Sequence, residues 1–248
     1  MSKEIVIYCV SFPRHEPRKK QVFQQNIMCN ASLLSEKERK RLKGKKYVFD
    51  DTGENISKLN NILGDLTATY WIWKNSTCDV VGTSQYRRFW DDSIEFINFD
   101  EKTLYVQDPF ILDNTLRNQY IGAHGKTGLQ LLDELATNNK IRLTPAMLEK
   151  TYSLRYIYSC NMFIAHKPLY DRFCEVLFEI VFELYNTYKE TIDKLDPYNR
   201  RLPAFVAERV VTALIVNREH FFPDMKIETI KWAVKKPHFI KRLLFNKK

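Results

Sequence analysis

The sequence predicts a single α/β domain in which short strands alternate with helices around a central mixed sheet. Apolar runs rich in β-branched and aromatic residues recur along the chain, and segments with apolar residues at helical spacing separate them. A chain of 248 residues is long for one compact domain, but undivided α/β folds often reach this length. Only 7 glycines are present and both phosphate-binding glycine motifs are absent, which disfavours a dinucleotide or P-loop fold.

The N-terminal part predicts two strands that flank a charged segment. Residues 4–10 are β-branched and aromatic, which favours a buried strand that opens the sheet. The run 35–46 is charged almost throughout and indicates a solvated helix end or loop rather than a binding patch. Residues 47–49 predict a second short strand, which leads into the turn-forming Asp and Gly residues of 50–53.

A helix and a strand follow this turn. Apolar residues recur at helical spacing between Asp65 and Asn75, and a negative charge on Asp65 in the first turn suits the helix dipole. Residues 79–84 predict a strand that delivers residues 85–88 at its carboxyl end. In open α/β sheets that end of the strands is where ligands bind.

The second half of the chain predicts two further strands and four helices. The strands are 104–106 and 157–165, and the helices are 126–137, 144–152, a long amphipathic helix between Leu169 and Tyr188, and a helix that follows Pro203. Proline is favoured in the first turn of a helix. The last helix turns Val206, Val210 and Leu214 toward the core and carries Glu208 in its second turn.

Cysteine usage and hydropathy predict a reduced, cytoplasmic protein. The five cysteines are scattered, with no Cys-x-x-Cys pair and no zinc-ligand spacing, so each is interpreted as a core thiol. No stretch approaches the ~20 apolar residues that span a bilayer, and the N-terminal run has the composition of a strand rather than a signal sequence.

The net charge of +9 is concentrated near the C-terminus. Residues 231–248 hold seven Lys and Arg and no acidic residue, so we expect a domain over 1–230 and a basic tail over 231–248. Apolar residues alternate with these cations, which is typical of an amphipathic helix at an anionic membrane surface. A solubilising terminus with a few core contacts is the alternative.

Segment 50–90 has the residue types that a nucleotide-sugar site requires. It combines an acidic turn, an aromatic helix and an arginine pair. These side chains are Asp50, Asp51, Glu54 and Asn55; Tyr70, Trp71 and Trp73; and Arg87 and Arg88. Carboxylates and amides bind hydroxyl groups, aromatic faces bind a base or sugar, and arginines bind a diphosphate. The alternative is that the tryptophans are core residues and that the arginines pair with Asp91 and Asp92.

Five ordered blocks of the sequence resemble a bacterial glycosyltransferase family of capsule, exopolysaccharide and O-antigen gene clusters. The blocks are DDTGENIS (50–57), DLTATYWIWKN (65–75), DVVGTSQYRRFW (79–90), NMFIAHKPLYDRFCEVLF (161–178) and PAFVAERVVTALI (203–215). That family was long labelled only as a domain of unknown function and includes galactofuranosyltransferases. The resemblance implies that residues 1–230 form a GT-A-like nucleotide-diphospho-sugar transferase fold.

In GT-A enzymes a short Asp-x-Asp motif after a central strand usually holds a divalent metal, and here that place is taken by residues 85–88. The resemblance therefore implies that Arg87 and Arg88 stabilise the departing diphosphate without a metal. Alternatively Asp50 and Asp51, or Asp91 and Asp92, supply carboxylate ligands for Mg or Mn.

The resemblance also implies roles for single residues. Glu208 is expected to be the general base. The expected donor-binding residues are Asp50, Asp51, Asn55, Gln85, Tyr86 and Trp73, and the expected acceptor-binding residues are Asn161 and His124, the latter in a loop before a helix. The sequence departs from the family at Gln85, where a histidine is usual, and at residues 11–13, where Thr-His-Lys is usual.

The expected function is transfer of a hexose, galactofuranose being one candidate, from a nucleotide-diphosphate donor to a hydroxyl group of a lipid-linked surface polysaccharide. The enzyme would act in the cytoplasm or peripherally at the inner face of the membrane. Two alternatives remain open: glycosylation of modified bases in phage DNA, where the basic tail would follow phosphates, and a non-catalytic polyanion-binding protein.

Overall fold

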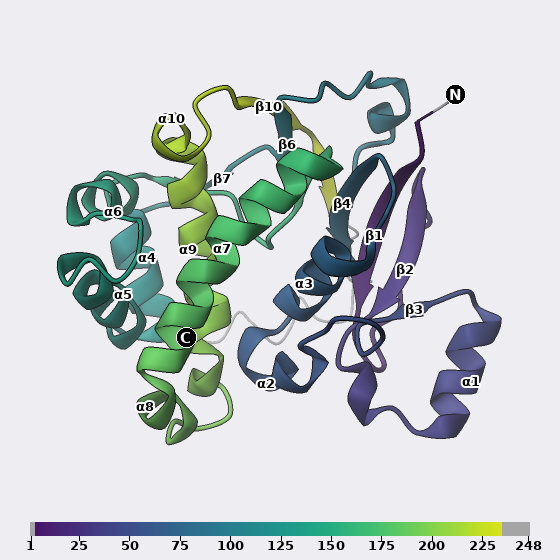
Figure 1. Ribbon diagram of the computed structural model, residues 1–248, viewed down its shortest axis with the longest axis horizontal. Coiled ribbons are helices and arrows are strands. Elements are labelled where there is room, and N and C mark those ends of the chain that lie inside the picture. Colours follow the sequence, from purple (N-terminus) through teal and green to yellow (C-terminus); the bar gives the residue numbers. More distant parts are fainter. Residues whose placement is uncertain (1–2, 235–248) are drawn as a thin grey trace.

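The structure describes residues 3–234, and in this computed structural model they form a nine-stranded sheet and a separate two-stranded sheet (Figure 1). The strands of the large sheet are β1 (Ile5–Ser11), β2 (Gln24–Met28), β3 (Val48–Phe49), β4 (Val80–Gln85), β5 (Arg88–Trp90), β6 (Thr103–Gln107), β9 (Phe163–His166), β10 (Lys226–Ile230) and β11 (Trp232–Val234). The small sheet pairs β7 (Phe110–Ile111) with β8 (Tyr156–Ile157).

The main path of the large sheet has the strand order β10-β6-β9-β4-β1-β2-β3, and β5 links β4 to β11. Neighbouring strands are parallel from β4 through β1 and β2 to β3, and again between β6 and β10. Strand β9 runs antiparallel to both β4 and β6. The sheet is therefore mixed, and the predicted α/β architecture is confirmed.

Helices cover one face of this sheet. The α-helices are α1 (Glu36–Gly44), α2 (Asn60–Leu63), α3 (Leu66–Asn75), α4 (Leu116–His124), α5 (Thr127–Thr137), α6 (Pro145–Tyr152), α7 (Lys167–Thr187), α8 (Lys189–Asp193), α9 (Leu202–Val216) and α10 (Arg218–Phe221). Short 3₁₀ helices are η1 (Ala31–Leu33), η2 (Ser57–Leu59), η3 (Asp92–Phe96) and η4 (Asn199–Arg201). Figure 1 shows α3 and α7 lying across the near face of the sheet.

The two largest hydrophobic clusters stabilise this arrangement. The larger core joins the sheet to α3, α5, α7 and α9 and includes the fully buried Phe173 and Val210. The smaller core lies around Trp90 and Phe99 and packs against the sheet from η3 and the segment that follows it. Burial of apolar side chains on both faces is the main favourable contribution to folding.

Most predicted elements are present, within one to three residues of their expected ends. The charged run 35–46 contains the nine-residue helix α1, which begins with a capping box between Ser35 and Glu38. The elements that the sequence pattern did not predict are β2, β5, β7, β10, β11, α2, α4, α8 and α10. Strand β2 was not predicted because its first three residues are polar and half-buried, so they lack the apolar pattern of a strand; these residues are Gln24, Gln25 and Asn26.

The prediction of one long strand over 157–165 is wrong. Residues 158–162 separate β8 from β9, and Cys160 and Asn161 have positive φ angles of 67° and 48°. Two consecutive left-handed residues turn the chain and are incompatible with a continuous strand. This kink contributes to the site described below.

The path of the chain creates a crevice beside β1. From β1 the chain moves outward to β2 and β3 on one side and then returns to β4 on the other side. The carboxyl ends of β1 and β4 therefore lie at a topological switch point, where ligands bind in open α/β sheets.

The first residues of the expected tail lie in the sheet. Strand β11 pairs antiparallel with β5, which places Val234 opposite Arg88. The rest of the expected tail, residues 235–248, lies outside the described residues, and so does its expected amphipathic helix. Within the described range, none of the helices has the length and apolar character to cross a membrane.

Candidate active site

A pocket of about 540 Å³ lies at the switch point, at the carboxyl ends of β1 and β4. Its walls come from the loop after β1, the turn before α3, the β4–β5 turn, the kink before β9 and the start of α9. The lining residues are Phe12, His15, Asn60, Asn61, Gly64, Asp65, Gln85, Tyr86, Arg87, Arg88, Cys160, Arg201 and Glu208. The structure thus brings together five of the residues expected from the sequence: Gln85, Tyr86, Arg87, Arg88 and Glu208.

The arginine pair is available for a ligand. Arg87 is exposed and Arg88 is half-buried, and within residues 3–234 neither forms an ion pair. The alternative pairing with the following aspartates is wrong: Asp92 is 2.8 Å from Lys19 Nζ, and Asp91 accepts a hydrogen bond from Ser93 N at 3.0 Å. Arg201 from η4 adds a third guanidinium to the lining. The wall of the pocket is therefore suited to an anion such as a diphosphate.

Asp65, expected from the sequence only as a residue of the first turn of a helix, lines the pocket. Its carboxylate accepts a hydrogen bond from Gln85 Nε2 at 2.8 Å and longer ones from Asn161 Nδ2 at 3.3 and 3.4 Å. Burial raises the pKa of Asp65 to about 6, and the nearby charge of Glu208 raises this pKa further. Asp65 is therefore a carboxylate that titrates close to neutral pH.

The kink at Cys160 and Asn161 connects the two carboxylates. Cys160 N donates a hydrogen bond to Glu208 Oε1 at 2.8 Å, and Cys160 O accepts one from Gln85 Nε2 at 3.2 Å. Asn161, expected to bind the acceptor, is buried beneath Asp65 and donates to it. Non-glycine residues in the left-handed region cost about 1–3 kcal/mol each, and such residues cluster at functional sites.

Glu208 projects from the second turn of α9 into the pocket, as expected. Its side chain is 27% exposed, and Oε2 accepts a hydrogen bond from the buried Arg209 at 3.0 Å. Arg209 also donates to Gln119 of α4 at 2.5 Å and to Phe205 O at 3.0 Å. These contacts fix the direction of the Glu208 carboxylate while leaving part of it open to the pocket.

The raised pKa of Asp65 predicts that Asp65→Asn stabilises the fold at neutral pH. A carboxyl whose folded pKa of about 6 exceeds the usual 3.8 binds its proton more tightly when folded. Its cost to stability is absent at low pH, develops between about pH 4 and pH 6, and is complete above pH 6. Asparagine removes the charge, and its amide can donate to Asn161 Oδ1, which has no hydrogen-bond partner among the described residues.

A fully buried carboxyl with this pKa shift would destabilise the fold by ~3 kcal/mol. Asp65 is only partly buried, so we expect Asp65→Asn to raise the free energy of unfolding by about 1–2 kcal/mol. Urea unfolding of both proteins near pH 7.5 and near pH 4 measures the gain. The difference should vanish at the lower pH, and an equal difference at both pH values would contradict the assignment.

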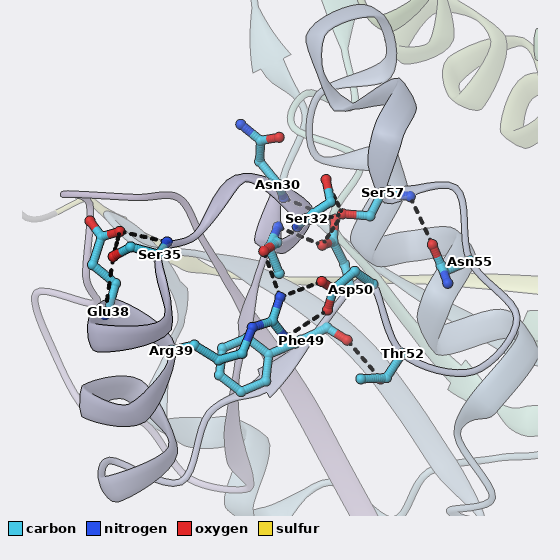
Figure 2. A network of polar contacts seen from close by, with 12 residues as sticks. Asn30, Ser32, Ser35, Glu38, Arg39, Phe49, Asp50, Thr52, Asn55 and Ser57 are labelled. Atoms are coloured by element: carbon cyan, nitrogen blue, oxygen red, sulfur yellow. Dashed lines mark hydrogen bonds and ion pairs between the residues drawn. The ribbon is translucent and has the colours of Figure 1, made fainter.

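Asp50, expected to bind the donor, has a structural role instead. It is fully buried, and Oδ1 accepts hydrogen bonds from Ala31 N at 3.0 Å and Ser57 Oγ at 2.6 Å. Oδ2 accepts from Asn30 N at 3.0 Å and Thr67 Oγ1 at 2.6 Å. Figure 2 shows Asp50 with Asn30 and Ser57 of this network, which ties β3 to η1 and η2. Both oxygens are fully used, so none is left for a ligand.

Asp51, Asn55 and Trp73 also lie outside the pocket lining. Asp51 forms an ion pair with Arg39 of α1. Asn55 donates to Gly53 O at 2.9 Å within its own loop. Trp73 stacks on Phe178 of α7, with ring centroids 5.5 Å apart, which is helix packing rather than a ligand platform. These contacts hold all three side chains within the fold, away from the residues that line the pocket.

His124 lies in a second pocket of about 440 Å³. It is the last residue of α4, so its expected place in a loop is wrong. Its ring stacks on Phe205 with centroids 4.0 Å apart, and Nδ1 is 3.1 Å from the Tyr198 hydroxyl. Burial first, and then the charges of Arg209 and Arg201, lower the pKa of His124 to about 4. The imidazole is therefore neutral at pH 7 and acts by stacking and hydrogen bonding.

The carboxylates offered as metal ligands do not fit that role. Asp50 has no free lone pair, Asp51 and Asp92 are held by basic side chains, and Asp91 caps η3. Among the residues described here, no group of three or more His, Cys, Asp or Glu side chains is placed to hold a metal ion. Carboxylates that line the pocket and could reach a diphosphate-bound Mg or Mn are Asp65 and Glu208.

All five cysteines are buried and free, as predicted. Cys160 is the one that lines the pocket, and burial together with the charge of Glu208 raises its pKa to about 12. A thiol that stays protonated at neutral pH is a poor nucleophile. Cys160 therefore contributes its backbone groups to the site.

Comparison with known proteins agrees with this architecture. A family model described as "Domain of unknown function (DUF4422)" matches residues 14–219. A solved structure described as the WbbM bifunctional glycosyltransferase in its apo form matches with a TM-score of 0.65 and 18% identity, over 96% of this chain and 48% of that chain. An active-site mutant of LgtC matches with a TM-score of 0.36 and 12% identity, over 94% of this chain and 88% of that chain.

No curated protein matches the chain. The match to WbbM shows a shared GT-A-like fold, and the chain spans about half the length of that protein.

Proposed function

The chain belongs to the family described as a domain of unknown function (DUF4422), and on that premise we propose that it is a glycosyltransferase. It transfers a hexose from a nucleotide-diphosphate donor to a hydroxyl group of a glycan. The observation that carries this proposal is one pocket, at the switch point of a GT-A-like sheet, that combines two carboxylates with arginines that form no ion pair among residues 3–234. This combination matches the charges of a nucleotide-sugar and of its reaction.

The donor lies with its diphosphate against Arg87, Arg88 and Arg201. Guanidinium groups bind phosphate oxygens through paired N–H donors, and their charge stabilises the leaving diphosphate. Tyr86, whose ring lies 5.1 Å from that of His15, provides an aromatic wall near this end of the pocket. Asn61 of α2 is exposed and offers its amide group to the hydroxyls of the sugar.

The reaction is a single displacement at the anomeric carbon of the donor sugar. The acceptor oxygen forms a bond to this carbon as the bond to the diphosphate oxygen breaks. The acceptor proton passes to Glu208, and the nucleoside diphosphate leaves against the arginines. Gln85 and Asn161 hold Asp65 in place, and Asp65 accepts a hydrogen bond from a hydroxyl of the bound sugar.

The acceptor glycan extends from the reaction centre to the aromatic pocket of His124. Arg201 lines the catalytic pocket, and its guanidinium lies 5.3 Å from the ring centroid of Phe205, which lines the aromatic pocket. Stacked aromatic faces are suited to a sugar ring, with polar atoms at the rim to bind its hydroxyls. The acceptor is a lipid-linked surface polysaccharide, and galactofuranose is the first donor sugar to test.

A donor panel tests the proposed function. We expect the purified protein to release nucleoside diphosphate from one member of a set of UDP-, GDP- and TDP-sugars, and mass spectrometry should detect a hexose on a glycan acceptor. Binding of donors without hydrolysis or transfer would instead favour the non-catalytic polyanion-binding alternative. Transfer to glycosylatable DNA, with no transfer to glycans, would favour the phage DNA alternative.

A further inference from the structure

Among residues 1–230, the basic charge is concentrated in one segment. Residues 14–46 contain eleven Lys and Arg against three Asp and Glu, a net charge of +8. Residues 1–230 together carry only +2, so the rest of this region has a net charge of −6. Residues 1–230 are therefore electrically polarised, because one cationic segment stands against a remainder that is acidic.

The structure gathers these cations on one side of the molecule, which we call the basic face. The basic face comprises the loop from β1 to β2, the helix α1 and the turn before β3. Figure 1 shows α1 at the periphery of the molecule, beyond β3. Six exposed cations of the basic face form no ion pair within residues 3–234: Arg14, Lys20, Lys37, Lys40, Lys43 and Lys46.

The basic face is hollowed by a groove of about 500 Å³. Lys20 and Lys46 line it, together with the amide side chains of Gln24, Gln25 and Asn26. Glu16 is the acidic residue of the groove, and it is paired with Arg41 at 2.5 Å and Lys45 at 2.6 Å. Exposed lysines around a hollow of this size suit a phosphate-bearing headgroup.

The exposed apolar side chain of Leu33 favours a membrane over nucleic acid as the anionic partner of the basic face. Leu33 of η1 is 76% exposed and stands three residues before the start of α1. An exposed apolar residue next to lysines is typical of surfaces that lie in the membrane interface. Single-stranded nucleic acid requires exposed aromatic rings for base stacking, and Phe23 and Tyr47 of the basic face are at least half-buried. The exposed ring of His15 lies 5.1 Å from that of Tyr86 and lines the catalytic pocket rather than the groove.

We infer that the basic face binds the anionic surface of a phospholipid membrane, with lipid phosphates in the groove and Leu33 in the interface. The loop after β1 connects this surface to the catalytic pocket: Phe12 and His15 line the pocket, whereas residues 16–20 line the groove. Arg18 N donates to Tyr86 O at 2.9 Å, which ties the loop to the arginine segment. Docking therefore holds the pocket beside the membrane, whatever reaction it performs.

Vesicle flotation of the full chain tests this inference without any measurement of activity. The protein should float with vesicles that contain phosphatidylglycerol and not with vesicles of phosphatidylcholine alone, and added salt should release it. Each Lys or Arg near an anionic surface raises the binding constant for the vesicle about fivefold. The triple variant K37Q/K40Q/K43Q and the groove variant K20Q/K46Q should each weaken binding about tenfold or more.

Matched controls separate the basic face from total charge and from residues 235–248. The variant K58Q/K126Q/K140Q removes three exposed lysines elsewhere and should bind as the unchanged protein does. Leu33→Ser should weaken binding to the same vesicles at low salt, where the protein is bound, because it removes the apolar contribution and leaves the charge of the basic face unchanged. The inference is overturned if both basic-face variants bind like the control, or if the protein prefers a free polyanionic glycan or DNA to the vesicles.

Discussion

The double variant R87Q/R88Q is expected to lower kcat by about 10³-fold while leaving the protein folded. Both side chains line the pocket, and within the described residues neither is needed to balance a buried charge. Removing one preorganised donor from a developing anion typically costs 10²–10³ in kcat, but two neighbours that share one diphosphate are not fully additive. The reason for the loss is that the departing diphosphate would meet neutral amides instead of two cations.

Steady-state kinetics with the donor identified by the panel measures this loss. The matched control is Arg142→Gln, which should leave kcat unchanged. Arg142 is an exposed arginine that pairs with Glu179, and neither residue lines the catalytic pocket. Lysine at both positions should restore part of the rate, because it keeps the charge but loses the paired donors. If EDTA abolishes the activity of the unchanged protein and Mn restores it, the arginines do not act alone as the electrophile.

The place of the arginine pair after a strand could be predicted from short-range features, whereas the expected role of Glu208 came from the family resemblance; the structure brings both to one pocket. A strand followed by cations, and an acid in the second turn of a helix that begins at a proline, are visible in a few consecutive residues. The α/β class follows in the same way from alternating strand and helix patterns. Where periodicity is weak, as in the polar strand β2, the sequence provided no comparable signal.

The different roles of Asp50 and Asp65 could not be predicted from short-range features. Both are acidic residues beside turns, and nothing in their immediate sequence distinguishes them. Asp50 is enclosed by donors from η1, η2 and α3, whereas Asp65 faces the pocket because residues 96 positions away approach it. The kink at Cys160 likewise lies within an apolar run that resembles a strand. Tertiary contacts of this kind override local patterns.

Glu208→Gln is expected to lower kcat by about 10²–10⁴-fold with little change in donor affinity. Glutamine is nearly isosteric and keeps an oxygen to accept the hydrogen bond from Cys160 N, but it cannot take up the acceptor proton. The substitution also removes the ion pair with the buried Arg209, which predicts some loss of stability. Kinetics must therefore be measured well below the unfolding midpoint, with donor binding followed by calorimetry to confirm that the pocket is intact.

The pH dependence decides whether Glu208 or Asp65 is the base. The charge of Glu208 raises the pKa of Asp65, so Glu208→Gln should lower the pKa of Asp65 below its present value of about 6. If Glu208 is the base, Asp65→Asn retains a measurable part of kcat, because it loses one contact to the sugar. The opposite result would be that Asp65→Asn abolishes transfer while Glu208→Gln remains active. If, in addition, the acid limb of the pH–kcat profile of Glu208→Gln lies at lower pH, Asp65 is the base that takes the acceptor proton. In that case the carboxylate that destabilises the fold at neutral pH is the one that performs the chemistry, a trade-off that active sites commonly make.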